Sequence, residues 1–152
     1  MPVRFMLRRE GLCLAAAFVF CASSAAATIA IPMTYLRQEV AAPPVLSNLD
    51  PIPEDRGIAG AQVALTDTKT TGSFMGHDYS LSVISVEPGG DFLDAARKAL
   101  SASKILFLDA TPEGILAVAD LPEARNALLF NVASGERRLR DVECRPNLLH
   151  TM

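Results

Sequence analysis

Short apolar runs that alternate with stretches of helical spacing constrain this chain more than any other feature of its sequence. Residues 104–108 (KILFL) and 127–132 (ALLFNV) are continuous apolar runs, typical of strands buried on both faces of a sheet. Between such runs, apolar residues recur every three or four positions, as in helices with one buried face. This order predicts an α/β fold, with a parallel sheet flanked by helices on both faces in a Rossmann-like arrangement.

The expected strands and helices follow from this periodicity. We expect strands at residues 28–35, 79–86, 104–108, 127–132 and 147–151. We expect helices at residues 57–69, 91–101 and 111–121. Asp91 and Thr111 are residue types that cap helix N-termini, and Pro112 suits a first helical turn.

Two segments between these elements are expected to be irregular. Residues 37–55 are rich in proline, and so long a loop inside a compact domain tends to be functional. Residues 134–144 are highly charged, and their basic run, 137–140, is expected to form a solvated loop. His77 lies near glycines and is expected to be a solvated turn residue.

Residues 1–27 have the three parts of a secretory signal: a basic start, an apolar middle and small residues before a cleavage after Ala27. The apolar middle, residues 11–22, is too short to cross roughly 30 Å of hydrocarbon, which needs about 20 residues. An amino-terminal membrane anchor is the alternative. The sequence therefore predicts export to the periplasm, with residues 28–152 as one domain.

Composition and charge exclude several classes of protein. Half of the residues are hydrophobic, which is incompatible with a disordered chain. The formal net charge of −3 argues against nucleic-acid binding, which needs a basic face. Cys144 is the one cysteine after residue 27, so that part cannot close an internal disulfide, and we expect the thiol to be buried.

No pattern in the sequence predicts a catalytic centre, a metal site or a cofactor site. The string Asp109-Ala110-Thr111 follows an apolar strand as in haloacid-dehalogenase-like phosphatases, but Thr111 stands where that motif needs a second Asp. His77 and His150 lack the neighbouring ligands of a metal site. Glycine-rich phosphate loops and nucleophile elbows are absent from the sequence. The chain is therefore not expected to be an enzyme.

Ligands of parallel sheets bind outside the carboxyl ends of the strands. This rule selects four places: Tyr35 with Arg37, then Glu87, then residues 109–111, and finally residues 131–134. We expect the hydroxyls of Thr111 and Ser134, with free backbone N–H groups at the helix start, to hold a carboxylate or another small polar group. The alternative is that Thr111 is only a helix cap and Ser134 only a turn residue.

Three strings give the chain a resemblance to a known family. They are PPVLSNLD at residues 43–50, GIAGAQVALTDTKTTGSFMG at 57–76 and CRPNLLHT at 144–151. In this order, after an export signal and a strand ending in Tyr35, they resemble the amino-terminal lobe of periplasmic substrate-binding proteins of the branched-chain amino-acid type (type I). The closer likeness is to the subgroup associated with pyrroloquinoline-quinone (PQQ)-dependent alcohol oxidation.

The resemblance implies the solute-binding component of an ABC-type importer, which takes a small polar solute to an inner-membrane permease. A PQQ-dependent dehydrogenase system would be a further partner. By position, the family's ligand contacts fall on Ala110 and Thr111, then on Ala133 and Ser134, with Tyr35 in the pocket wall. Because the family has two lobes, the resemblance also implies either a truncated receptor or one lobe that is used alone. A lone lobe is expected to expose the flank that its partner lobe covers, and therefore to have poor solubility.

Two other functions fit the sequence. One is a non-catalytic periplasmic accessory protein of an alcohol-oxidation system, with the proline-rich residues 41–53 as its contact surface. The other is a phosphatase-like α/β hydrolase, which would need a nucleophile and a base near residue 109.

Overall fold

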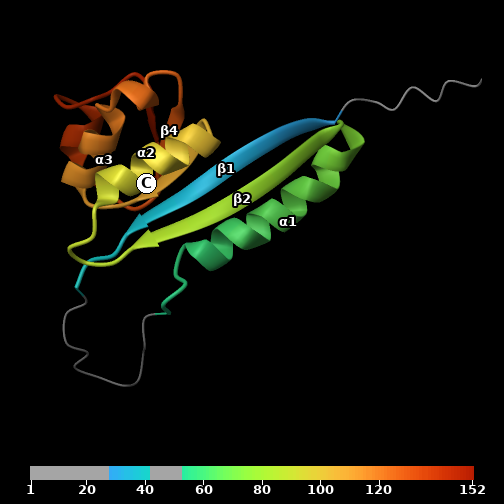
Figure 1. Cartoon of the computed structure of the whole chain (residues 1–152), viewed down its shortest axis with the longest axis horizontal. Helices are drawn as coiled ribbons and strands as arrows, with labels where there is room; N and C mark the ends of the chain where they lie inside the picture. The colour runs from blue at the N-terminus through green and yellow to red at the C-terminus, as the bar shows by residue number, and fades with distance from the viewer. Residues whose placement is uncertain (1–27, 42–52) are drawn as a thin grey trace, which may run out of the picture.

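The computed structural model describes residues 28–41 and 53–152, which form a parallel sheet between layers of helices (Figure 1). The strands are Ile29–Gln38 (β1), His77–Val86 (β2), Ile105–Asp109 (β3), Leu128–Asn131 (β4) and Leu148–His150 (β5). The α-helices are Ile58–Phe74 (α1), Phe92–Ala102 (α2) and Pro112–Ala119 (α3). Two 3₁₀ helices, Pro122–Ala124 (η1) and Arg137–Arg140 (η2), complete the described elements.

The five strands are all parallel and lie in the order β2-β1-β3-β4-β5. The predicted fold class, a parallel α/β sheet with helices on both faces, is therefore confirmed. The predicted export signal, residues 1–27, lies outside the described residues, as does most of the predicted proline-rich loop, residues 42–52. Within the described parts of the chain, no helix combines the length and the apolar character needed to cross a bilayer.

The main core lies between the sheet and the pair α2 and α3. Successive side chains of a strand point to opposite faces, so Leu36 of β1 and Leu106 and Leu108 of β3 turn towards these two helices and are fully buried. The amphipathic face of α2 and the apolar residues of α3 pack against them. This layer holds most of the buried apolar surface, the main stabilising term in folding.

The predicted caps of α2 and α3 are confirmed. The side chain of Asp91 accepts a hydrogen bond from the backbone N–H of Asp94 at 2.9 Å. The hydroxyl of Thr111 accepts one from the N–H of Gly114 at 3.2 Å, and Pro112 occupies the first turn. Each cap satisfies an N–H group that the helix itself leaves without a partner.

Among the described helices, α1 is the one on the opposite face of the sheet, where it packs along β2 (Figure 1). The helix continues to Phe74, beyond the predicted end at Lys69, because Gly72 can lie against the ring of Tyr79 on β2. A Cβ atom at Gly72 would come within 2.6 Å of that ring. Glycine is therefore what lets the last turns of α1 approach the sheet.

The prediction that β3 and β4 are buried on both faces is wrong, because α1 does not extend over them. The side chains that these strands and β5 turn towards α2 and α3 are buried, whereas Leu128 is 51% exposed and Leu149 43% exposed. The apolar runs are real strands, but on the α1 side no described helix lies over them.

Strand β1 also extends past its predicted end at Tyr35, to Gln38. Its full length pairs with β2, and β3 pairs only with its second half, from Thr34 to Arg37. Pro32, which weakens the sequence signal for a strand, lies in the half that pairs with β2 alone.

Three smaller expectations are also wrong. His77 is the first residue of β2 and half-buried, with Nδ1 at 3.3 Å from the hydroxyl of Tyr79. The basic run forms η2 instead of a loop and buries Leu139, although Arg137 and Arg140 are exposed as expected. The thiol of Cys144 is exposed rather than buried.

Replacing Gly72 by Ala should lower the free energy of unfolding by about 1–3 kcal/mol, because the added methyl group forces α1 away from β2. The matched control is Gly60→Ala on the same helix, where a Cβ atom meets nothing within 4 Å. That substitution should stabilise by roughly 0.5–1 kcal/mol, since alanine is the better helix former. Urea unfolding followed by circular dichroism measures both; a stabilised Gly72→Ala variant would contradict this packing.

Candidate functional site

The carboxyl ends of β1, β3 and β4 lie side by side and form the polar edge of the sheet. Arg37 is in register with Asp109, and Leu108 with Asn131. Three of the four places selected by the sequence are thus neighbours. The fourth, Glu87, follows the outer strand β2 and is exposed.

Asp109 is the centre of a cluster with two residues of β1. Its Oδ2 atom accepts hydrogen bonds from the hydroxyl of Tyr35 and from Nε of Arg37, both at 2.9 Å. The other guanidinium nitrogens of Arg37 donate to the backbone carbonyls of Glu54, at 2.7 Å, and of Arg56. The cluster therefore fixes the ends of two strands and the turn that precedes α1.

Burial and charge determine the protonation of this cluster. Burial, followed by the hydrogen bond to Asp109, raises the pKa of Tyr35 from 10.0 to about 12. Burial opposes the charge on Arg37, but the hydrogen bond to Asp109 raises the pKa of the guanidinium above its ordinary value. At neutral pH the phenol keeps its proton, and the two charges of Arg37 and Asp109 cancel.

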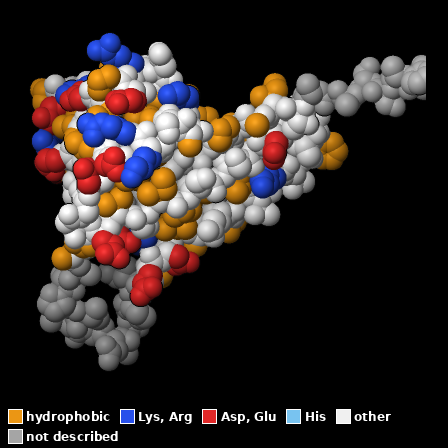
Figure 2. Space-filling model, viewed as in Figure 1, with side chains coloured by type: hydrophobic (Ala, Val, Ile, Leu, Met, Phe, Trp, Pro, Cys, Tyr) orange, Lys and Arg blue, Asp and Glu red, His pale blue; other side chains and the backbone are white. Residues whose placement is uncertain are grey.

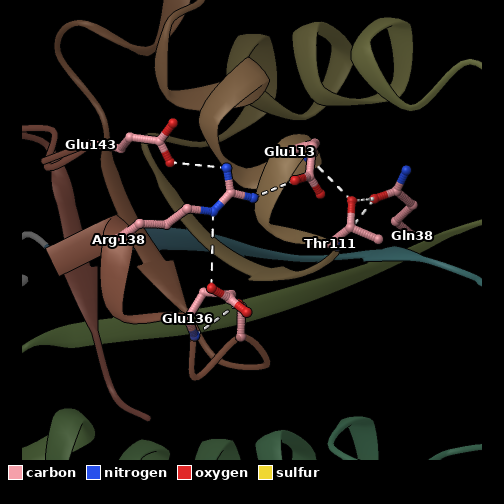
Figure 3. Close-up of polar contacts among 8 residues, drawn as sticks. Gln38, Thr111, Glu113, Glu136, Arg138 and Glu143 are labelled. Carbon is pink, nitrogen blue, oxygen red and sulfur yellow. Dashed lines mark hydrogen bonds and ion pairs between the residues drawn. The ribbon is translucent and has the colours of Figure 1, made fainter. Parts of the chain in front are cut away.

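A second contact at the polar edge joins Gln38 to Thr111 (Figure 3). Oε1 of Gln38 accepts hydrogen bonds from the backbone N–H of Thr111 at 3.2 Å and from its hydroxyl at 3.0 Å. Gly114 allows this approach, because a Cβ atom there would lie 2.5 Å from the same oxygen. The side-chain amide thus occupies the place of a bound acceptor.

This contact corrects the prediction of free N–H groups at the start of α3. The N–H of Thr111 bonds to Gln38, that of Gly114 bonds to the hydroxyl of Thr111, and that of Ile115 bonds to the Thr111 carbonyl. A carboxylate at Thr111 would have to displace Gln38.

The loop after β4 is held in a similar way by the fully buried Asn131. Its Oδ1 accepts from the N–H groups of Ala133, at 3.2 Å, and Ser134, at 2.8 Å. Its Nδ2 donates to the carbonyl of Ser134 at 2.7 Å and lies 3.1 Å from Nδ1 of His150. The two N–H groups expected to meet a ligand are again satisfied within the chain.

The contact with Asn131 determines that Nδ1 of His150 is a hydrogen-bond acceptor. Since Oδ1 of Asn131 accepts two N–H groups, Nδ2 must be the atom that faces the ring, and Nδ1 of His150 must accept. Burial first, and the charge of Arg140 second, lower the pKa of His150; a backbone group of Leu139 opposes them. Nε2 is buried and has no hydrogen-bond partner among the described residues.

The polar residues of the string CRPNLLHT have structural partners. Arg145 forms a two-point ion pair with Asp120, and Nδ2 of Asn147 donates to the carbonyl of Ala124 at 2.9 Å. The N–H and the hydroxyl of Thr151 both donate to the carbonyl of Asn131 at 3.1 Å. This segment therefore anchors β5 against β4 and the residues after α3.

Arg138 anchors η2, which precedes the string CRPNLLHT in the chain, to α3 (Figure 3). Its guanidinium contacts Glu113 in the first turn of α3, lies 3.1 Å from Glu143, and lies 3.9 Å from Glu136. The backbone N–H of Glu113 and then Arg138 lower the pKa of that carboxyl. These ion pairs are exposed, so each contributes little by itself, but together they fix the position of η2.

A cavity of about 420 Å³ lies between α1 and the sheet. The sheet contributes Met33, Tyr35, Tyr79, Leu81 and Phe107, and Val132 follows β4. The α1 side contributes Gly57, Ala61, Ala64, Leu65 and Thr68. Tyr35 belongs both to the lining of this cavity and to the polar edge.

The structure thus brings Tyr35, Thr111 and Ser134 to one edge, together with Ala110 and Ala133 beside them. Gln38 was not predicted as a residue of the site, although it comes directly after Arg37 on the same strand. The cavity was not predicted either; its one sequence signal is the set of small residues at helical spacing in α1. Among the described residues, no group of His, Cys, Asp and Glu is arranged to hold a metal ion.

Comparison with protein-family models, curated proteins and solved structures gives no match for this chain.

Alkaline titration of the phenols should show one group with a pKa of about 12. Tyr35→Phe should remove it, leaving the second of the two tyrosines. Because the folded state holds this proton more tightly, its contribution to stability is complete below pH 10 and is lost as the pH rises towards 12. Asp109→Asn should lower this pKa without restoring 10.0, since burial remains; an unchanged pKa would contradict the cluster.

His150 should make the fold sensitive to acid. Its lowered pKa means that the unfolded chain binds the proton better, so stability is complete above pH 6.5 and decreases as the pH falls below it. Denaturant unfolding at about pH 7.5 and pH 5.5 measures the difference. His150→Gln should reduce this difference in the free energy of unfolding between the two pH values, and His77→Gln should leave it unchanged. The same difference in both variants would refute the assignment of the acid sensitivity to His150.

Proposed function

We propose that this chain is the solute-binding component of an ABC-type importer and that its polar edge is the binding surface. The solute would lie over the ends of β1, β3 and β4, with its polar group near Asp109, Thr111 and Ser134. The observation that supports the proposal is the meeting of the polar edge with an apolar cavity at Tyr35. A concave apolar space with a few polar groups is the usual form of a small-molecule site.

The resemblance stated above supplies the setting of this proposal. The chain would act in the periplasm, deliver a small polar solute to an inner-membrane permease, and serve a PQQ-dependent alcohol-oxidation system. In this setting the exposed sheet face at Leu128 and Leu149 would be the uncovered flank.

A binding role fits Asp109 better than a hydrolytic one. One oxygen of this carboxylate is engaged by both Tyr35 and Arg37, and a guanidinium neighbour reduces the nucleophilicity that a phosphatase-like mechanism needs. Thr111 stands where the phosphatase motif has its second Asp, and its hydroxyl is already hydrogen-bonded to Gln38 and to the N–H of Gly114.

Thermal-shift screening of the full chain against amino acids, alcohols, aldehydes and short acids tests the proposal. A bound solute should raise the melting temperature, because it stabilises the folded state by RT ln(1 + L/Kd), where L is the free solute concentration. The Ser134 hydroxyl accepts from the N–H of Glu136 and donates to no described residue, so Ser134→Ala should weaken binding roughly three- to tenfold, the effect of one hydrogen bond. Thr111→Ala should also weaken binding, because it removes the hydroxyl that holds Gln38 at this edge. Thr66→Ala, which removes an exposed hydroxyl of α1, is the control.

Absence of any shift across the four classes would contradict the proposal and favour the accessory role. Unchanged affinity in both edge variants would remove Thr111 and Ser134 from the site.

A further inference from the structure

The apolar cavity and the polar edge lie on the same face of the sheet. Side chains two residues apart on a strand share a face, so Arg37 follows Tyr35 on β1 and Asp109 follows Phe107 on β3. Tyr35 and Phe107 line the cavity. The ion pair of Arg37 and Asp109 therefore stands at the carboxyl end of this apolar space.

The ion pair has unused hydrogen-bonding capacity of both kinds. Asp109 uses Oδ2 for both of its donors, and no described residue donates a hydrogen bond to its Oδ1; the side chain is 25% exposed. Arg37 uses three of its five N–H donors, one for Asp109 and two for backbone carbonyls. Because the two charges cancel, the polar end favours a neutral group that can both donate and accept, such as a hydroxyl, over a carboxylate or an ammonium group.

The size and lining of the cavity favour an apolar occupant. Its volume of about 420 Å³ lies in the range of roughly 300–1,000 Å³ that is typical of small-molecule sites. Small residues of α1, Ala61 and Ala64 among them, leave the space empty. Figure 2 shows charged side chains gathered over the α2 and α3 part of the molecule, and few of them along α1 and β2.

From this geometry we infer that the cavity under α1 receives the apolar tail of the solute, and that the solute is a neutral amphiphile with one hydroxyl-type donor at its head. The head donates to Oδ1 of Asp109, and the tail extends along Tyr35 and Phe107 between α1 and the sheet. The inference rests on the proposed function, because the head lies at the polar edge.

Titration calorimetry of the full chain with straight 1-alkanols, from propanol to octanol, tests the class of solute. Each added methylene group should increase the affinity about fourfold, as burial of one methylene predicts, until the cavity is full. Beyond that length the affinity should level off.

Two substitutions in the lining of the cavity should change how alkanol affinity depends on chain length. Ala61→Leu fills the cavity and should weaken hexanol binding at least tenfold, whereas Ala59→Leu, exposed on the same helix outside the lining, should not change it. Leu65→Ala enlarges the space and should move the plateau to longer alkanols. Circular dichroism confirms that each variant is folded.

The outcomes separate this inference from the proposed function. Affinity that does not depend on chain length, or that survives Ala61→Leu, overturns the cavity assignment and leaves the polar edge. A dependence on length that Asp109→Asn leaves untouched retains the tail site but overturns both the head assignment and the proposed edge. Binding of no alkanol, or self-association of the chain that Ala61→Leu abolishes, overturns the inference.

Discussion

The ion pair of Arg37 with Asp109 is the contact on which the rest of the polar edge depends. One guanidinium joins the ends of β1 and β3 and also holds two carbonyls of the turn before α1. Gly57 follows that turn with φ of +84°, and a Cβ atom there would lie 2.5 Å from the hydroxyl of Tyr35. The start of α1 and the buried phenol are therefore positioned by one charged group.

The covering of the sheet explains why the molecule has an open side. Parallel sheets are stable when helices cover both faces. Here α2 and α3 cover one face, whereas on the other face the one described helix, α1, packs along β2. The consequence is an apolar strip along β3, β4 and β5, which continues from the cavity through Phe107. The same incomplete cover produces both the accessible cavity and the exposed Leu128 and Leu149.

Periodicity and capping residues were sufficient to predict the succession of strands and helices along the sequence, the α/β class and the caps at Asp91 and Thr111. They failed where a distant partner decides the outcome. The length of α1 depends on the ring of Tyr79 beside Gly72, and the burial of β3 depends on how far α1 reaches. At the site, the sequence placed Thr111 and Ser134 correctly at strand ends. It could not show that Gln38 and Asn131 already satisfy their N–H groups, since those contacts form only after the strands pair.

The contacts of the string CRPNLLHT also show that its residues determine packing within the chain. Arg145, Asn147 and Thr151 bind a carboxylate and two backbone carbonyls of the chain itself, and His150 faces Asn131. Such residues specify how β5 packs against β4, so their order constrains the fold more than the ligand. The chemistry of a solute is instead decided by groups with unused capacity. In the proposed site these groups are Oδ1 of Asp109 and the unused N–H groups of Arg37, whose cancelled charges beside an apolar cavity favour a neutral hydroxyl.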